Sequence, residues 1–176
     1  MIYQPTENLV FAVDYNRRYF NPDEVFVGGG TGSFIANKPF GDSATTSDNL
    51  GFQFNWRVFD NFEFGGWFGS TWADQKQGGD DNATVINWAT TLAFPDLLKE
   101  GDMLGVVVGM PPKVVDHSID DLEEDDDTSI HIETFYRFQI NEYIGITPGF
   151  YLITDPEHDS RNDTIFVGVL RTLFQF

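Results

Sequence analysis

Short segments that alternate apolar and polar residues recur along this chain of 176 residues. Successive side chains of a β-strand point to opposite faces of a sheet, so such alternation predicts strands with one apolar and one polar face. Gly, Asn and Asp residues separate the segments, as is typical of turns. We therefore predict eight strands, near residues 7–15, 50–59, 62–72, 83–94, 102–110, 129–140, 143–153 and 163–176.

The segment 129–140 shows the division between the two faces most clearly. One of its faces carries Ile, Ile, Thr, Tyr, Phe and Ile, and the other carries Ser, His, Glu, Phe, Arg and Gln. In a soluble barrel or sandwich the apolar face would be the core, whereas in a membrane barrel it would contact lipid. The alternation alone fits both classes of protein.

The lengths of the connections separate these two classes. Short connections at 60–61, 95–101 and 141–142 alternate with longer ones at 16–49, 73–82, 111–128 and 154–162. Outer-membrane barrels have short turns at one rim and long loops at the other. An up-and-down strand order places all the short turns, and both chain ends, at one rim. The sequence thus predicts an all-β fold, an antiparallel up-and-down transmembrane β-barrel of outer-membrane type, over residues 1–176.

Composition limits the partners and the compartment. The formal net charge of −18 argues against binding to nucleic acid or to anionic membrane surfaces, both of which require basic patches. No apolar run approaches the roughly 18 residues that a transmembrane helix needs. The chain has no cysteine, hence no disulfide framework or thiolate metal site, and no signal peptide follows Met1. We expect no cofactor.

The last predicted strand ends on Phe176, an aromatic residue. A soluble domain rarely ends inside an amphipathic strand, because terminal residues normally fray into solvent. A closed barrel, by contrast, keeps its last strand paired. We expect its outward Phe166, Leu170, Phe174 and Phe176 to face lipid.

Several stretches of the chain resemble the carbohydrate-selective OprB-type porins, in the form that cyanobacterial outer membranes carry. The similar stretches are 61–69, 92–97, 122–133, 136–139, 146–149 and 162–176, so the resemblance covers most of the chain from Leu50 onward. It implies a passive porin in an outer membrane of Gram-negative type.

The same resemblance implies further strands and partners. Members of this family resemble 16-stranded barrels preceded by a surface-layer-homology domain, and this chain lacks that domain and roughly half the strands. It is therefore similar to the C-terminal half of such a porin. The implied partners are outer-membrane lipid, the missing N-terminal strands, the barrel-assembly machinery, for which Phe176 matches the recognition signal, and a homotrimer in the full-length form.

Three inward-facing arginines, Arg57, Arg137 and Arg171, are expected a few residues from the short-turn rim. Guanidinium groups at a similar height in a lumen raise the local anion concentration and donate hydrogen bonds to oxygen-rich solutes. Alternatively, each arginine is a structural partner of an inward carboxylate, such as Glu63 for Arg57. With them, we expect the pore to be lined by Gln53, Asn55, Glu63, Trp67, Glu133, Phe135 and Tyr151.

The aromatic residues are expected in two settings. Inward Trp67, Phe135 and Tyr151 could stack on sugar rings, although aromatics in barrels more often pack than bind. Outward aromatics should form a girdle at the membrane interface near the short-turn rim, namely Phe62, Phe64, Phe94, Phe138 and Phe174.

Other patterns suggest little chemistry. The Gly-rich stretch 28–32 lies in a connection that is either external or folded into the lumen, and it lacks the Lys and Ser/Thr of a phosphate loop. The acidic run 120–127 lacks calcium-loop spacing and is better explained as a solvated loop. Ser129 and His131 are the sole candidates for a hydrolase, and residues 155–159 form a weak metal pattern. We expect neither an enzyme nor a metal site.

Two other functions remain open at this stage. One is a structural or anchoring barrel that conducts nothing, and the other is a soluble eight-stranded binding barrel whose aromatic face is buried. An eight-stranded lumen has room only for packed side chains. The predicted first and last strands therefore need partners outside this sequence, because an open sheet edge is not tolerated in lipid. We expect the chain alone not to be a functional channel.

Overall fold

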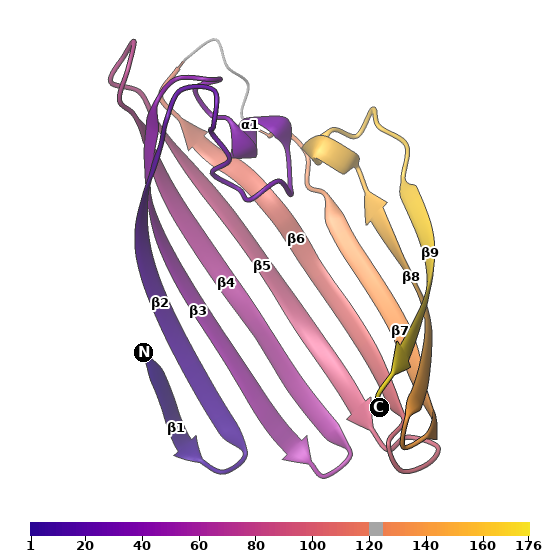
Figure 1. Cartoon of the computed structure of the whole chain (residues 1–176). Coiled ribbons are helices and arrows are strands. Elements are labelled where there is room, and N and C mark those ends of the chain that lie inside the picture. Colours follow the sequence, from indigo (N-terminus) through magenta and orange to yellow (C-terminus); the bar gives the residue numbers. More distant parts are fainter. Residues whose placement is uncertain (120–124) are drawn as a thin grey trace.

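The structure, a computed structural model, is described over residues 1–119 and 125–176. Its strands form one antiparallel sheet of nine strands in chain order (Figure 1). None of the helices among these residues is long and apolar enough to cross a membrane. The strands are β1 (Ile2–Thr6), β2 (Leu9–Phe20), β3 (Thr45–Phe59), β4 (Phe62–Gln75), β5 (Asn82–Pro95), β6 (Met103–His117), β7 (Ile130–Asn141), β8 (Ile144–Thr154) and β9 (Ile165–Phe174), with a short helix α1 (Phe34–Asn37) and a 3₁₀ turn η1 (Pro156–His158).

The eight predicted strands correspond to β2 through β9, and β1 was missed. Every residue of β1 is exposed, and Pro5 lies within it, so neither alternation nor turn residues mark it as a strand. Because Ile2 pairs with Ala12, the N-terminal end lies partway along β2 (Figure 1). The expectation that both chain ends lie at the short-turn rim was therefore wrong for this end.

Several strands extend further toward the long loops than their apolar alternation does. β2 reaches Phe20, β3 begins at Thr45 and β6 reaches His117. The β6 strand continues past Pro111 and Pro112 because its register with β5 shifts there, which forms a bulge. Conversely, β9 ends at Phe174 rather than at the last residue.

The predicted alternation of short and long connections holds except at one place, where the connection 76–81 is shorter than the following connection 96–102. Residues 7–8, 60–61, 96–102 and 142–143 make the short turns at one rim, and residues 21–44, 76–81, 118–119, 125–129 and 155–164 belong to the connections at the opposite rim (Figure 1). We call these the short-turn rim and the long-loop rim.

The sheet is antiparallel throughout but is not closed. Its order begins with β1 and ends with β9. Since neighbouring strands alternate in direction, β1 and β9 run the same way and could pair with each other only in parallel. Antiparallel closure would need an odd number of additional strands between these two edges.

The two faces of the sheet differ in chemistry, as the alternation predicts. The outer face exposes large apolar side chains, and on β9 Phe166, Leu170 and Phe174 are each more than 60% exposed. Near the short-turn rim its aromatics meet in pairs, with the rings of Phe62 and Phe94 centred 5.1 Å apart. A soluble surface rarely presents so continuous an apolar face.

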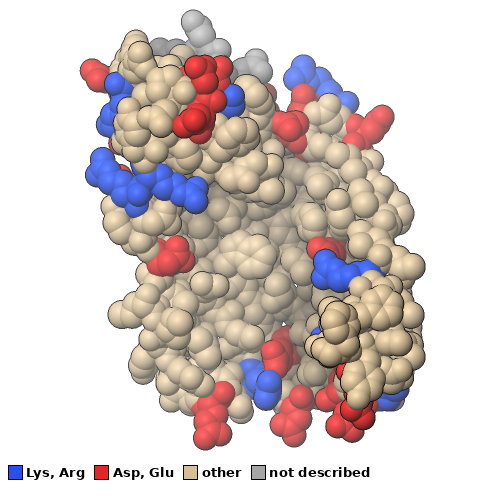
Figure 2. Space-filling model, viewed as in Figure 1, with Lys and Arg blue, Asp and Glu red and all other residues tan. Residues whose placement is uncertain are grey.

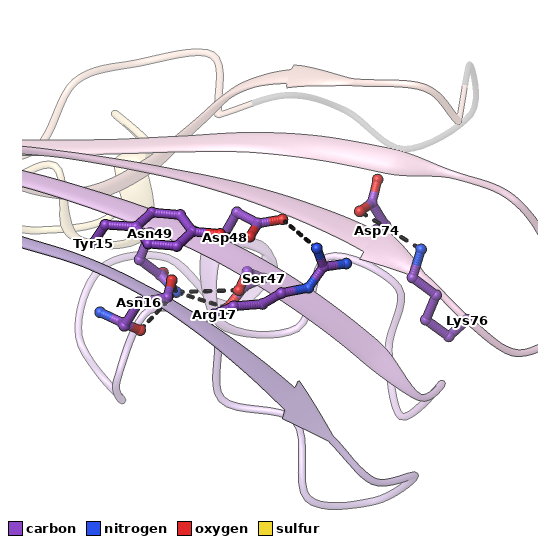
Figure 3. A network of polar contacts seen from close by, with 8 residues as sticks. All are labelled: Tyr15, Asn16, Arg17, Ser47, Asp48, Asn49, Asp74 and Lys76. Atoms are coloured by element: carbon purple, nitrogen blue, oxygen red, sulfur yellow. Dashed lines mark hydrogen bonds and ion pairs between the residues drawn. The ribbon is translucent and has the colours of Figure 1, made fainter.

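The outer face turns polar where β2, β3 and β4 approach the long-loop rim. The Tyr15 hydroxyl donates a hydrogen bond to Asp48 at 2.5 Å, and Arg17 lies 3.7 Å from the same carboxylate (Figure 3). Asp74, near the end of β4, lies 3.6 Å from Lys76, the first residue after that strand. The apolar part of the outer face is thus bounded by charged residues on this side.

Most of the buried apolar residues lie near the long-loop rim, where residues 21–44 fold over the inner face. Two small clusters form there, one around Val25, Val27 and Phe40 and the other around Ala36. They pack against inner-face residues of β4, β5 and β6, namely Ala73, Ala83, Val85 and Val114. Of the two placements considered for this connection, the structure has the one folded inward. We call residues 21–44 together with 125–129 and 155–160 the loop cap.

Candidate pore-lining site

The concave inner face is hollowed between the β2–β4 side and the β8–β9 side (Figure 2). Charged side chains gather mostly at the two rims, and a few lie on the walls between them (Figure 2). Each of the ten candidate pore-lining residues lies in β3, β4, β7, β8 or β9. The structure divides them into two groups on opposite sides of the hollow.

The first group surrounds an ion pair on β3 and β4. Arg57 and Glu63 are directly paired across the two strands, and Arg57 Nε and Nη2 lie 2.8 and 2.7 Å from Glu63 Oε1. Asn55 approaches the other carboxylate oxygen at 3.5 Å. Arg57 therefore has the structural partner considered from the sequence, while more than half of its side chain stays exposed.

Trp67 lies further along β4 on the same face. It is paired with Gln53 on one side and Ala89 on the other, and its indole N–H donates to the Asn87 side chain at 3.2 Å. The residue is 45% exposed. Its hydrogen bond fixes its orientation, which is what a stacking surface for a ring-shaped solute requires.

The second group lines a pocket of about 380 Å³ on β7, β8 and β9, which we call the β7–β9 hollow. Its lining includes five of the candidate residues, Glu133, Phe135, Arg137, Tyr151 and Arg171, together with His131, Met103 and Thr147. The His131 and Tyr151 rings stack 5.1 Å apart, and His131 Nε2 lies 3.4 Å from Glu133. His131 therefore belongs to this lining, although it entered the sequence analysis only as an enzyme candidate.

Arg137 and Arg171 share the β7–β9 hollow, whereas Arg57 does not. Arg137 donates from Nη2 to the Gly101 carbonyl at 3.2 Å, while its buried Nε has no partner in the described part of the chain. Arg171 is paired with Thr147 in the sheet and makes no hydrogen bond or ion pair with any described residue. The arrangement thus has one arginine neutralised by a carboxylate and two that are not.

Small residues make room for the aromatic part of this lining. A side chain at Gly105 would collide with the Phe135 ring, and one at Gly149 would lie 2.9 Å from Phe135 Cβ. Both glycines are paired with Phe135 in the sheet. Phe135 therefore lies along the wall of β6, and glycine is required opposite it.

The loop cap contains a polar network that the sequence analysis did not find. Asp125 is 8% exposed, and its Oδ2 accepts hydrogen bonds from the Val114 N–H at 2.6 Å and the Ser33 hydroxyl at 2.8 Å. Ser33 in turn caps α1 by accepting from the Ala36 N–H. Burial raises the pKa of Asp125, and these hydrogen bonds partly oppose that rise.

His158, at the end of η1, is the most buried histidine in this network, at 1% exposed. Its Nδ1 accepts from the Ser129 N–H at 2.9 Å, and its Nε2 lies 3.0 Å from the Pro112 carbonyl. Burial lowers the pKa of His158. In sequence this histidine lies in an ordinary acidic loop, so no local signal marks it as buried.

The side chains of the hydrolase pattern and of the metal pattern make other contacts in the structure. The Ser129 hydroxyl donates to the Thr154 carbonyl, whereas His131 contacts Glu133 and Tyr151. Glu157 and His158 hydrogen-bond to backbone groups, and Asp159 binds Arg161. Over the described ranges no three His, Asp or Glu side chains gather into a set that could hold a metal. Most of the acidic run 120–127 lies outside the described residues.

Comparison with known proteins identifies the family. Over 92% of its length the chain is 34% identical to an uncharacterised protein of Synechocystis sp., and over 82% it is 27% identical to an uncharacterised protein of Nostoc sp.. It spans 33% and 24% of these two relatives, so it corresponds to a third or less of their length. No solved structure matches it. The model of the carbohydrate-selective porins of the OprB family matches residues 3–176, and the chain belongs to this family.

Proposed function

We propose that this chain forms part of the wall of an outer-membrane pore through which small hydrophilic solutes diffuse passively. Membership of a porin family supports this function. The observation that carries it is the division of one sheet into an outer face of exposed apolar residues and an inner face with arginines, carboxylates and amides. A lipid-facing outside and a water-filled inside require this division.

The β7–β9 hollow favours oxygen-rich solutes, such as sugars or inorganic anions. Arg137 and Arg171 donate from planar guanidinium groups, and the stacked His131 and Tyr151 rings offer an aromatic surface beside them. The Arg57 and Glu63 pair on the opposite wall carries no net charge. The passage of such solutes then depends on Arg137 and Arg171, and not on Arg57.

The strand count supports a pore made with further strands. Nine strands cannot close with antiparallel pairing alone. The 16 strands implied by the family resemblance would add seven to the nine present, which is the odd number that closure needs. We therefore expect no channel steps from the chain alone in a planar bilayer, and steps once the strands that precede this region in a family member are joined to its N-terminal end.

Single cysteines test the face assignment, since the chain has no native cysteine. Gln53→Cys and Asn55→Cys lie on the inner face, and Phe52→Cys and Phe54→Cys lie on the outer face of the same strand. In lipid vesicles, a water-soluble maleimide should label the inner pair, and a lipid-borne quencher should quench a fluorophore only on the outer pair. Labelling of both pairs, or a stable monomer in detergent-free buffer, would contradict the membrane pore and favour the soluble barrel.

A further inference from the structure

His158 joins three connections of the long-loop rim. Its imidazole binds the start of β7 through the Ser129 N–H and binds β6 through the Pro112 carbonyl. Its own carbonyl accepts from the Asp127 N–H at 3.1 Å. The same Pro112 carbonyl also accepts from the Ser33 N–H at 3.3 Å, next to α1. One buried ring therefore lies where the β2–β3, β6–β7 and β8–β9 connections meet.

The backbone around His158 is in an unusual conformation. Asp155, Glu157 and His158 have φ angles of 43°, 62° and 54°, in the left-handed region that residues other than glycine rarely adopt. Glu157 accepts from the Phe34 N–H at 2.5 Å and so fastens this segment to α1. Three such residues in a four-residue segment persist only if the surrounding contacts hold them.

We propose that His158 is a latch for the loop cap, which stays closed while the imidazole is neutral and opens when the imidazole is protonated. The closed arrangement needs Nδ1 as a hydrogen-bond acceptor and Nε2–H as a donor. In the imidazolium both nitrogens carry hydrogen, so Nδ1–H would face the Ser129 N–H. Protonation thus removes one hydrogen bond and brings two donors together in a buried site.

Two charged groups near the ring act on its protonation. Lys113, on β6, disfavours the imidazolium, whereas Asp125 favours it by Coulomb attraction. Asp127 lies close to the same lysine, because Lys113 Nζ donates to the Asp127 carbonyl at 2.5 Å. Desolvation is the largest effect, so the pKa of His158 in the closed cap lies below its ordinary value.

The direction of the pH effect follows from this shift. In the open cap the solvated imidazole titrates near its ordinary pKa of about 6.5. Below that pH the open form binds a proton that the closed form excludes, so each pH unit favours opening by up to about tenfold. Asp125 acts in the opposite direction, because its raised pKa favours the closed cap as pH falls toward about 4. The shift toward the open cap is therefore expected as pH falls below about 6.5.

The loop cap covers inner-face residues of β4, β5 and β6, so its opening would widen the long-loop side of the lumen. That consequence rests on the proposed pore function, whereas the latch itself does not. The test therefore measures cap opening in the intact chain in detergent micelles, without reference to conduction. Failure of the pore function and failure of the latch are thereby distinguishable.

The first measurement is NMR of ¹⁵N-labelled histidine in the unmodified chain. The expected result is a neutral His158 protonated on Nε2 at pH 7.5, with a midpoint below the ordinary histidine pKa of about 6.5. A His158 that titrates at or above about 6.5 would overturn the latch. This measurement needs no substitution and so does not depend on the folding of a variant.

The second measurement uses Val85→Cys, whose thiol would lie beneath the loop cap at a position 2% exposed. Its labelling rate, divided by that of Gln53→Cys to remove the pH dependence of thiol ionisation, should rise about fivefold as pH falls from 6.5 to 5.5.

Two variants of His158 provide matched controls in the Val85→Cys background. His158→Asn keeps an acceptor toward Ser129, and His158→Gln keeps a donor toward Pro112, but neither titrates. In both variants the labelling ratio should not rise as pH falls from 6.5 to 5.5. The same rise on lowering the pH in either variant, or a constant ratio with His158 present, would overturn the proposal.

Discussion

Asp125 fastens the loop cap to β6 through a single carboxylate oxygen, and its replacement measures what holds the cap closed. The Val114 N–H and the Ser33 hydroxyl both donate to Oδ2, and Val114 and Ser33 are at most 2% exposed. In Asp125→Ala both donors lose their acceptor in a site that water does not reach. An unsatisfied buried donor costs about 1–3 kcal/mol.

The magnitude follows from these two donors and from the charge that is removed. The Ser33 hydroxyl can rotate and still accepts a hydrogen bond from the Ala36 N–H, so the cost of removing its acceptor falls at the lower end of this range. Removing the charge also relieves the desolvation that raises the pKa of Asp125. We expect Asp125→Ala to destabilise the closed cap by about 2–4 kcal/mol, which is about 30- to 900-fold in its opening equilibrium. Asp125→Asn can place its amide oxygen where Oδ2 lies and should stay within about 1 kcal/mol.

Amide hydrogen exchange in detergent micelles measures this equilibrium. The Val27 N–H is a suitable reporter, because it donates to the Asn37 carbonyl at 2.9 Å within the cap and does not touch Asp125. Its protection should fall by the expected factor in Asp125→Ala alone. Equal losses in the Ala and Asn variants would show that charge rather than hydrogen bonding holds the cap, and no loss in either would refute the role of Asp125.

The pH dependence of the same reporter follows from the raised pKa of Asp125. A carboxyl group that binds its proton more readily in the closed cap stabilises that cap at pH below about 3.9, and this extra stability is lost as pH rises through the raised pKa. Asp125→Asn should lack this dependence, which an exchange series over pH can measure. A dependence that persists in the Asn variant would assign it to another group.

Three further substitutions have expected outcomes. Gly32 has a φ of 78° and lies against a carbonyl of β6, whereas Gly41 has a φ of 61° and open space around it. Gly32→Ala should therefore reduce the exchange protection of the loop cap more than Gly41→Ala, which bears only the cost of a left-handed backbone conformation, about 1–2 kcal/mol. Gly105→Ala should displace the aromatic ring of β7 that lies over it, seen as a changed ring environment by NMR, whereas Gly168→Ala, with nothing within 4 Å, should leave spectra and stability unchanged. Glu63→Gln should change the unfolding free energy by less than about 1 kcal/mol, because the pair is exposed, and in a conducting pore should shift the reversal potential toward anion selectivity. Equal effects of a variant and its control, or an unshifted reversal potential, would contradict these expectations.

The order of the strands could be predicted because its signals are local. Alternation with period two and turn residues define β2 to β9, and the difference between short and long connections gives the up-and-down order. The polar ends of β2 and β6, and all of β1, carry no alternation and were missed. At those positions pairing with a neighbouring strand, rather than burial of one face, holds the strand.

The candidate pore residues could be placed on the inner face from the same periodicity, but their grouping could not. Strand register and sheet curvature put Arg137 and Arg171 in one hollow and leave Arg57 with Glu63. Their sequence positions relative to the turns suggested one common zone. Pairing between strands, which the spacing along one strand does not determine, placed the three arginines in two separate groups instead.

By itself, then, the sequence determined a two-faced antiparallel sheet with an apolar outside, because backbone geometry forces alternate side chains to opposite faces. Only the tertiary structure decided which polar residues are buried. Ser33 and Asp125 are 92 residues apart in the chain, and His158 meets Pro112 across 46. Such contacts depend on how three connections fold over one wall, and that arrangement is set by packing between distant segments rather than by any local pattern.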